Sequence, residues 1–383
     1  MAGPLTGLRV VALEQAVAAP LCTRHLADLG ADVIKVERPG GDFARHYDTI
    51  VAGQSAYFVW LNRGKRSIEL DLTNGSDRAV MDRLLERADV FVHNLGPGAV
   101  DRLGYGWTEL HERSPKLICC EISGFGSDGP YRDRKAFDLL LQGESGLTSI
   151  TGDLDRPAKV GISIADICSG MYALTGVMAA VINRSLSGAG TRIEVSMLEC
   201  LAEWMSVPAL YRMHRGQEPP RSGLYHSMIA PYGPYVARDG RLVNIAVHNG
   251  GQWSRLCQVL ELTDLESDER FATNELRVRN RIALDQLIDE RLDSIDGGEL
   301  CRRLQLADVP YGDLNDVLGL INHPQLQARG HWIDVAVPGG STKAISHPFN
   351  LAGIVQSESK VPALDEDGDR IRSELGLARK VPR

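Results

Sequence analysis

The first half of the chain alternates short, continuous apolar runs with segments of helical periodicity. Four runs rich in β-branched residues are LRVVALE (8–14), DVIKVER (32–38), DVFVHN (89–94) and KLICCEISGF (116–125). Continuous apolar runs of this length are typical of parallel strands, because both faces of such strands are covered and neither meets water. The pattern therefore predicts a strand-helix-strand rhythm over this half.

The segments between these runs predict helices. PLCTRHLADLG, residues 20–30, opens with a proline, which suits the first position of a helix. SDRAVMDRLLERA, residues 76–88, begins with a serine that suits a helix cap. Its apolar residues share one helical face: Val80, Met81, Leu84, Leu85 and Ala88. Strands and helices that alternate in this way predict an α/β fold with an open, doubly wound sheet.

A long apolar helix is predicted at about residues 164–184, within KVGISIADICSGMYALTGVMAAVINR. It carries one acidic residue, Asp166, together with polar residues and two glycines. Because a charge inside a bilayer is costly, the segment favours a buried helix over a membrane span. Residues 191–197 then predict a strand, and residues 197–213 a helix.

The composition changes after residue 215. RGQEPPRSG, residues 215–223, predicts a linker, and residues 231–247 predict a β-hairpin that turns at Asp239-Gly240. Charged helices follow, and one of them is expected to bury Ile282, Leu284, Leu287, Ile288 and Leu292. We predict a large domain that begins at 1–215, a smaller α+β domain at 220–325, and a C-terminal segment, 326–383, that returns to the large domain.

The bulk composition is that of an ordinary globular protein, with 43% hydrophobic and 24% charged residues among 383. The formal net charge of -8 argues against nucleic acid or an anionic membrane surface as the main partner. Seven cysteines without C-x-x-C or zinc-finger spacing predict reduced, buried thiols. The opening residues, MAGPLTGLRVVALE, lack the layout of a secretory signal, so we expect a cytoplasmic protein.

Several common catalytic motifs are missing from the sequence. The loop after the first run is EQAVAAP, which has no G-x-G-x-x-G fingerprint, and neither a P-loop nor a G-x-S-x-G elbow occurs. The ten histidines are dispersed, without H-E-x-x-H spacing. We therefore expect no metal site, no dinucleotide and no serine-hydrolase chemistry.

Asp166 is open to two interpretations that are compatible with one another. It caps the following helix by accepting hydrogen bonds from the first-turn N–H groups. Alternatively, it is a nucleophile, a partly desolvated carboxylate at a helix N-terminus whose backbone donors stabilise a developing oxyanion.

Basic residues follow several of the predicted strands. In α/β folds ligands bind beyond the carboxyl ends of strands, so some of these cations are expected to converge on a phosphate. The candidates are Arg38, Lys65, Arg66, Arg102 and Lys135.

Several long blocks of the sequence resemble one known family. LGADVIKVERPGGD, LNRGKRSIELDL, ADVFVHNLGPGAVDRLG, ISGFGSDGPYRDRKAFD and GISIADICSGMYAL are similar to blocks of the family III CoA-transferases. That group includes formyl-CoA transferase and is related to α-methylacyl-CoA racemase. The resemblance implies a Rossmann-like open parallel sheet in a large domain built from both chain ends, a smaller α+β central domain, and an interlocked homodimer.

The resemblance also implies roles for individual residues. Asp166, in SIADICSG, matches the catalytic aspartate of the family. Coenzyme A, or acyl-CoA as the substrate, is then expected at Val17, Ala18, Arg38, Leu70, Asp71, Leu72, Thr73, Asn94, Leu95, Arg102, Lys135, Phe137 and Asp138. Gln15, Tyr225 and His226 are candidate contacts to the substrate acid.

Two departures from the family patterns narrow the activity. The racemase branch has a histidine where this chain has Phe137, directly before Asp138, and phenylalanine cannot carry a proton. Formyl-CoA transferase has a run of glycines where this chain has SGLYHSMIAPYGPY, so an oxalate and formate substrate pair is not expected.

The segment at 222–235 instead resembles transferases that act on C4 and C5 dicarboxylates, of the mesaconate, citramalate and itaconate type. His226 is then either a ligand of the distal carboxylate or an ordinary loop histidine, and His248 and Asn249 are weaker candidates.

We therefore predict an enzyme that moves CoA between an acyl-CoA thioester and a free carboxylic acid. Its expected intermediates are an anhydride and a CoA thioester of Asp166. A 2-methylacyl-CoA racemase or epimerase, and a CoA-binding protein without turnover, are the alternatives.

Overall fold

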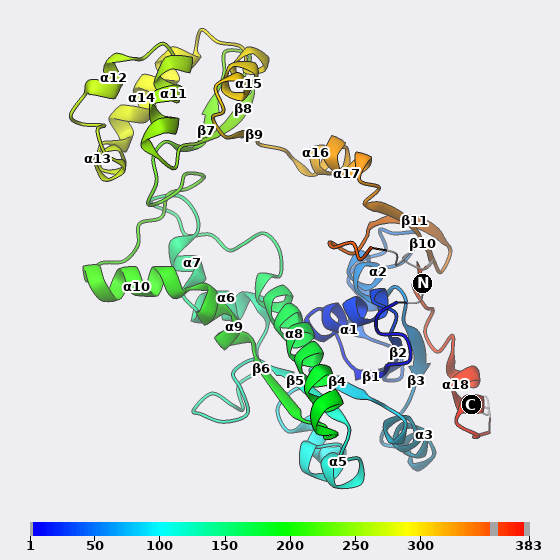
Figure 1. Ribbon diagram of the computed structural model, residues 1–383. Helices are drawn as coiled ribbons and strands as arrows, with labels where there is room; N and C mark the ends of the chain where they lie inside the picture. The colour runs from blue at the N-terminus through cyan, green and yellow to red at the C-terminus, as the bar shows by residue number, and fades with distance from the viewer. Residues whose placement is uncertain (1–2, 353–358, 379–383) are drawn as a thin grey trace. The chain divides into compact units, whose positions relative to one another are not determined.

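The computed structural model describes residues 3–352 and 359–378. A parallel six-stranded sheet, in the order β3-β2-β1-β4-β5-β6, organises the first part of the chain (Figure 1). Its strands are β1 (Arg9–Leu13), β2 (Asp32–Glu37), β3 (Arg66–Glu69), β4 (Val90–His93), β5 (Ile118–Ser123) and β6 (Arg192–Ser196). The predicted α/β fold with an open parallel sheet is confirmed.

The strand order reverses direction between β1 and β4. The chain runs from β1 outward through β2 to β3, and then crosses back to place β4 on the other side of β1. The loops that leave β1 and β4 therefore diverge, which opens a crevice at the carboxyl edge of the sheet. The position of this crevice follows from the topology alone.

Strand β3 was missed by the sequence analysis, which named its first residue, Arg66, only among the cations of which some were expected to converge on a phosphate. The strand has only four residues, RSIE, and only Ser67 and Ile68 are buried. Charges at both of its ends hide the apolar pattern, because these side chains lie at the edge of the sheet.

Helices cover both faces of the sheet. Before β6 the chain forms α1 (Ala18–Asp28), the 3-10 helix η1 (Phe43–His46), α2 (Ala56–Asn62), α3 (Gly75–Glu86), α4 (Ala99–Arg102), α5 (Trp107–Arg113), α6 (Asp138–Glu144), α7 (Leu147–Ile150) and α8 (Ile164–Ser187). On one face, Val11, Ile34 and Phe91 of the sheet pack against Met81 and Leu84 of α3. Helix α3 is capped by Asn74, not by the predicted Ser76, which lies inside its first turn.

On the other face, α8 crosses close to the beginning of α1 (Figure 1). A Cβ atom on Gly170 of α8 would lie 2.6 Å from the carbonyl oxygen of Ala18 and 3.1 Å from Cβ of Leu21. Only glycine allows this approach, because any side chain at position 170 would meet backbone atoms of α1. Asp166 lies one helical turn before Gly170 and is therefore carried to the loop that precedes α1.

Helix α8 is the one helix of the described ranges with the length and apolar composition of a membrane span, a test that buried core helices also pass. It packs against α1, β5, β6 and α9 (Met197–Trp204). The predicted helix at 197–213 is interrupted at Met205, where α10 (Ser206–Arg215) begins as a separate helix.

The chain contacts group residues into two units. The first, which we call the sheet unit, comprises residues up to Ser145, Val160–Ser206 and the chain from Pro324 onward. The second unit comprises Gly146–Lys159 and Val207–His323. The domain limits drawn from the sequence, 1–215, 220–325 and 326–383, stay predictions.

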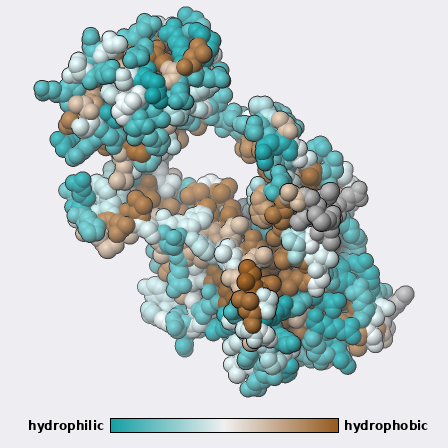
Figure 2. All heavy atoms as spheres, viewed as in Figure 1, coloured by the Kyte–Doolittle hydropathy of each residue, from teal (hydrophilic) through white to brown (hydrophobic). Residues whose placement is uncertain are grey.

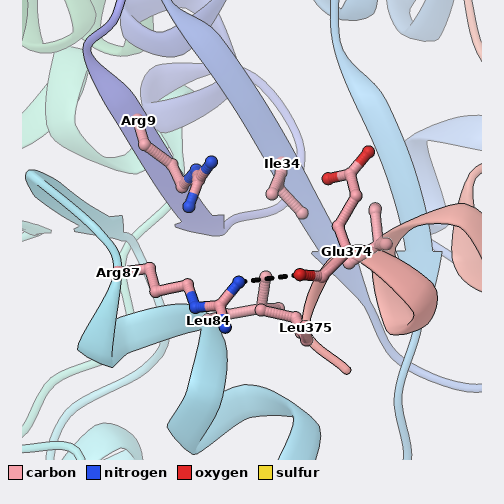
Figure 3. A pocket seen from close by; sticks show the side chains of 7 residues that line it. Arg9, Ile34, Leu84, Arg87, Glu374 and Leu375 are labelled. Carbon is pink, nitrogen blue, oxygen red and sulfur yellow. Dashed lines mark hydrogen bonds between the residues drawn. The ribbon is translucent and has the colours of Figure 1, made fainter. Parts of the chain in front are cut away.

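The last segment of the sheet unit adds, within its described residues, a small sheet and two helices. Its elements are α17 (Pro324–Ala328), β10 (Trp332–Val337), β11 (Gly340–Ile345), β12 (Ser359–Lys360) and α18 (Gly368–Glu374). Figure 3 shows the attachment of α18, where Arg87 donates a hydrogen bond of 2.7 Å to the carbonyl oxygen of Glu374. The Glu374 carboxylate also pairs with Arg66 of β3 at 2.8 Å.

The second unit contains an antiparallel sheet of β7 (Tyr232–Val236), β8 (Leu242–Ala246) and β9 (Tyr311–Asp313). Its helices include α11 (Gly250–Val259), α12 (Asp264–Ser267), α13 (Asn274–Arg279), α14 (Arg281–Leu292), α15 (Gly297–Leu306) and α16 (Val317–Ile321). The predicted hairpin with Gly240 in its turn is confirmed. The predicted burial of Ile282 is wrong, because this residue is 85% exposed while Leu284 and Ile288 of the same helix are buried.

The approach at Gly170 yields a test of the fold. Gly170→Ala is expected to destabilise the protein by about 1–3 kcal/mol, because the new methyl group overpacks the α1–α8 contact. The matched control is Gly143→Ala on α6, where a Cβ would meet nothing within 4 Å. This control is expected to be neutral or slightly stabilising. Chemical denaturation measures both, and equal stability of the two variants would contradict the packing argument.

Candidate active site

A cavity of about 610 Å³ lies at the carboxyl edge of the sheet, at the crevice between β1 and β4. The loops after β1, β4 and β5 line it together with η1, α2 and the first turn of α8. Its volume is in the range of small-molecule sites. Nine of the residues predicted to contact CoA or substrate line this cavity: Gln15, Val17, Ala18, Asn94, Leu95, Lys135, Phe137, Asp138 and Asp166.

Asp166 is the third residue of α8, and its carboxylate lines the cavity. Within the described part of the chain, no group donates a hydrogen bond to this carboxylate. Burial, and secondly the negative charge of Asp138, raises the pKa of Asp166 from 3.8 to about 7. The side chain is therefore a poorly solvated carboxylate that is about half protonated at neutral pH.

Asp138 caps the helix that carries Asp166. One oxygen of its carboxylate, Oδ1, accepts a hydrogen bond of 2.7 Å from the backbone N–H of Ala165. Ser163, the residue at the cap position itself, makes no capping bond through its side chain. The interpretation of Asp166 as the cap is therefore wrong, since that role belongs to a residue outside the helix.

The loop after β1 is held from both sides. The side-chain amide of Asn94 accepts from the backbone N–H of Gln15 at 2.9 Å and donates to the carbonyl oxygen of Gln15 at 2.8 Å. The backbone N–H of Ala16 donates to Oδ1 of Asp42 at 3.2 Å. Ala16 has a φ of 59°, in the left-handed region that is strained for alanine by roughly 1 kcal/mol or more. These bonds hold the strained turn beside the cavity.

A buried cluster of charges supports that loop from below. Lys65 donates to the Glu14 carboxylate at 2.6 Å, and Lys35 donates to Asp42 at 2.9 Å, with all four side chains excluded from solvent or nearly so. The neighbouring cations keep the pKa of Glu14 below its usual value, although burial acts in the opposite direction. Lys65 itself has a pKa lowered to about 8, chiefly by burial.

Two of the cations proposed for phosphate binding are therefore engaged elsewhere. Lys65 lies within the buried cluster, and Arg66 pairs with Asp32 at 3.0 Å and with Glu374 at 2.8 Å. For these two residues the predicted anion-binding role is wrong. Their position in the sequence did not reveal these carboxylate partners, of which Glu14 is buried, whereas Asp32 and Glu374 are partly exposed.

The remaining predicted CoA contacts lie at the same edge of the sheet but do not line the cavity. Arg38 is exposed after β2, and its guanidinium donates to the carbonyl oxygen of Gly41 at 3.2 Å. Residues 70–73 follow β3, where Asp71 accepts a hydrogen bond of 2.6 Å from the Thr73 hydroxyl. Arg102, also exposed, donates to the carbonyl oxygen of Pro97 at 3.4 Å. Whether these residues contact CoA stays a prediction.

Several cavity residues escaped the sequence analysis: Phe43, Tyr47, Tyr57, Arg134 and Met197. Tyr47 and Tyr57 form an edge-to-face pair with ring centroids 5.6 Å apart. Burial, together with the charges of Asp42 and Asp166, raises the pKa of Tyr47 to about 12, so this phenol stays protonated. Both tyrosines lie outside the strand-end motifs, Tyr47 directly after η1 and Tyr57 within α2, and no motif in the sequence marked them.

The candidate substrate residues of the second unit have local partners of their own. The His226 ring stacks on Tyr232 at 5.1 Å, and its Nδ1 accepts from the backbone N–H of Met228 at 3.1 Å. Asn249 caps α11 by accepting from the backbone N–H of Gln252 at 2.9 Å. Contact of Tyr225 or His226 with substrate stays a prediction. Over the described residues, no three histidine, cysteine or acidic side chains gather as a metal site would need.

Comparison with known proteins gives matches over nearly the whole chain. The model of CoA-transferase family III matches residues 5–368. A succinate–glutarate CoA-transferase of Agrobacterium fabrum is 35% identical over 97% of this chain and 96% of its own length. An acetyl-CoA:oxalate CoA-transferase of Acetobacter aceti is 34% identical over 97% of this chain and 96% of its own length. The crystal structure of a CAIB/BAIF family protein from Brucella suis is similar, with a TM-score of 0.86 and 37% sequence identity. The match covers 98% of this chain and 100% of that protein's chain.

The raised pKa of Asp166 predicts a cost to stability. A carboxyl whose pKa is higher in the folded than in the unfolded state loses stability as pH rises from about 4 to about 7. Asp166→Asn is therefore expected to stabilise the protein on the order of 1–2 kcal/mol above pH 7, after allowance for screening by solvent, and to have little effect near pH 4. Thermal denaturation against pH measures this. A variant less stable than the wild type at pH 8 would indicate a capping role instead.

Proposed function

The chain belongs to CoA-transferase family III, and from that membership we propose that it moves CoA between an acyl-CoA thioester and a free carboxylic acid through Asp166. One observation carries the proposal. A carboxylate to which none of the described residues donates a hydrogen bond, with a pKa raised to about 7, lines a cavity at the topological switch of the sheet. An acid is the nucleophile that this exchange needs, because its anhydride returns readily to a thioester.

The proposed reaction balances without an added reactant. An oxygen of ionised Asp166 attacks the thioester carbonyl, and the C–S bond breaks to give an aspartyl anhydride and CoA thiolate. The thiolate attacks the aspartyl carbonyl, which gives an aspartyl-CoA thioester and releases the donor acid. The acceptor carboxylate then attacks this thioester, which gives a second aspartyl anhydride and CoA thiolate. The thiolate attacks the acceptor's acyl carbonyl, which forms the new acyl-CoA and releases the Asp166 carboxylate. Overall one thioester is consumed and one is formed, and each intermediate keeps an activated acyl group, so positioning and exclusion of water are the main tasks of the protein.

The cavity supplies two features that support this chemistry. Poor solvation of the Asp166 carboxylate favours attack, because fewer hydrogen bonds must be broken. The first turn of α1 begins at Ala18 beside the cavity, and the first N–H groups of a helix have no partner within the helix. We propose that backbone donors of this turn stabilise the oxyanion.

We propose that CoA follows the carboxyl edge of the sheet. Its contacts in this proposal are Val17, Ala18, Arg38, Leu70, Asp71, Leu72, Thr73, Asn94, Leu95, Arg102, Lys135, Phe137 and Asp138. The support is their common position after the ends of β1 to β5, where open α/β sheets bind ligands. Exposed cations on this edge, Arg38, Arg102 and Lys135, suit the phosphates of CoA.

The acid partner is proposed to be a C4 or C5 dicarboxylate, with succinyl-CoA as a donor. The Agrobacterium relative is named for succinate and glutarate, whereas the Acetobacter relative is named for oxalate, a shorter diacid. Arg134, which also pairs with Glu144 at 3.1 Å, gives the cavity a further cation that suits a second carboxylate. Gln15, Tyr225 and His226 remain the proposed contacts to this acid.

We further propose a cytoplasmic homodimer with interlocked chains, and no nucleic-acid or membrane partner. Figure 2 shows apolar side chains gathered on the face of the sheet unit that carries α8. Large apolar residues of α8 itself are exposed, among them Ile182 at 60% and Leu186 at 83%. A second copy of the chain would remove such residues from water.

Trapping of the intermediate tests the nucleophile. Wild-type protein incubated with succinyl-CoA is expected to carry CoA on Asp166, and hydroxylamine is expected to convert only this carboxylate to a hydroxamate, as read by peptide mass spectrometry. Asp166→Ala should lose exchange by a factor of ~10⁴ or more and retain CoA binding. Asp133→Ala, at an exposed carboxylate, is the matched control. Turnover retained by Asp166→Ala rejects the assignment.

The pH dependence tests the protonation state. Only ionised Asp166 attacks, so the rate of enzyme-CoA formation is expected to rise with pH through about 7 and then level. Removing the neighbouring negative charge in Asp138→Asn should move this midpoint to lower pH. Single-turnover kinetics measure both, and a midpoint near 4 in the wild type would contradict the desolvated site.

A panel of acids identifies the reaction. The enzyme is given succinyl-CoA or acetyl-CoA together with one of five acids: succinate, glutarate, mesaconate, itaconate or oxalate. Mass spectrometry detects the new CoA thioesters, and the C4 and C5 diacids should react fastest. Deuterium incorporation at the α-carbon of a 2-methylacyl-CoA would indicate a racemase instead, because transfer exchanges no α-proton. Tight binding of CoA without exchange of any acid would indicate a binding protein.

A further inference from the structure

The buried side-chain amide of Gln142 links the segment before α8 to Asp138, the residue that caps the first turn of α8. Gln142 is the fifth residue of α6 and is fully buried, at 0% exposure. Its Nε2 donates to Oδ2 of Asp138 at 2.7 Å, and its Oε1 accepts from the backbone N–H of Val160 at 2.9 Å. The two residues Asp138 and Gln142 are one helical turn apart, so their side chains share a face of α6.

The orientation of this amide is fixed by its partners. The Val160 N–H only donates and the Asp138 carboxylate only accepts, so the oxygen of Gln142 must face Val160 and its nitrogen must face Asp138. The other oxygen of Asp138 holds the N–H of Ala165, directly before Asp166. The chain Val160–Gln142–Asp138–Ala165 thus joins the segment entering α8 to the first turn of α8.

We propose that Gln142 is a positioning residue for Asp166, which acts by fixing the carboxylate of Asp138 against the first turn of α8. Gln142 is fully buried and is not among the residues that line the cavity. Its effect passes through Asp138, which both holds the Ala165 N–H and places a negative charge beside Asp166. The role of Gln142 in transfer rests on the proposed function.

Few other charged or titratable groups face Asp166. The loop before α6 contributes Arg134 and Lys135 to the cavity, and η1 and α2 contribute Tyr47 and Tyr57. The lining residues from α1, α9 and β5 are uncharged: Ala18, Met197, Ile122 and Ser123. Among the described residues, Asp138 is therefore the one acidic neighbour that lines the cavity with Asp166. No other lining residue could supply the negative charge beside Asp166 if Asp138 moved.

The substitution Gln142→Glu tests the proposal because it keeps the shape of the side chain. A protonated glutamic acid reproduces both bonds, since its O–H donates to Asp138 and its carbonyl oxygen accepts from Val160. An ionised glutamate instead faces Asp138 with a second negative charge, and the two carboxyls then share one proton with a raised pKa. The defect should therefore appear only as pH rises.

We expect the rate of Asp166-CoA formation in Gln142→Glu, per CoA-binding molecule, to lie within ~3-fold of the wild type at pH 5.5 and at least ~10-fold below it at pH 8.5. Gln142→Leu removes both bonds at every pH, so its defect should be independent of pH. In Asp138→Asn/Gln142→Glu the donor and acceptor are exchanged, and the steep loss above neutral pH should disappear.

Two outcomes would overturn the proposal. One is a ratio of Gln142→Glu to wild-type rates that is flat between pH 5.5 and 8.5. The other is a purely structural effect, in which the melting temperature of Gln142→Glu falls with pH while the rate per CoA-binding molecule stays at the wild-type level.

A second readout separates this proposal from the proposed function. Carbodiimide labels protonated carboxyls, so the pH midpoint of Asp166 labelling reports its titration without any transfer. This midpoint should lie near 7 in the wild type and higher in Gln142→Glu. Wild-type protein that never forms the CoA adduct would refute the transferase mechanism alone, whereas an unchanged labelling midpoint in Gln142→Glu would refute the role of Gln142 alone.

Discussion

The contact of α8 with the beginning of α1 at Gly170 is the constraint on which the site depends. A Cβ at this position would lie 2.6 Å from the Ala18 carbonyl oxygen, so the two helices approach as closely as backbones allow. Asp166 stands one turn earlier on α8 and therefore reaches the loop after β1. That loop and the loop after β4 are joined by the Asn94–Gln15 hydrogen bonds and diverge beyond them, because the strand order reverses between β1 and β4. Sheet topology makes the crevice, and one glycine brings the carboxylate into it.

The protein buries carboxylates in two opposite ways within the same unit. Glu14 and Asp42 are enclosed with Lys65 and Lys35, so they stay charged and support the strained turn at Ala16. Asp166 is partly buried beside an acidic neighbour and receives no hydrogen bond from the residues that the structure describes, so its charged form is disfavoured. The first arrangement gives a fixed scaffold. The second stores free energy that, in the reaction we propose, is released when the carboxylate becomes an uncharged anhydride or thioester.

The continuous apolar runs were enough to predict four of the strands in the sheet, β1, β2, β4 and β5, because a buried parallel strand excludes polar residues from both faces. Strand β3, with two charged ends, lacked that signal. The motif around Asp166 and the resemblance of whole blocks identified the family. Neither the apolar pattern nor the family resemblance distinguished the buried Lys65, which pairs with Glu14, from Lys135, which lines the cavity. A lysine after a turn has the same sequence signature in both cases.

The sequence by itself determined the α/β class, the family and the identity of the one acidic residue in the long apolar helix. Each of these depends on local periodicity or on a contiguous motif. Only the tertiary structure decided that Asp138 caps this helix, that Gln142 holds Asp138, and that Tyr47 and Tyr57 share the cavity. These contacts join segments far apart in the chain, or they depend on which way a side chain points. Both are set by packing, which leaves no pattern within a single stretch of sequence.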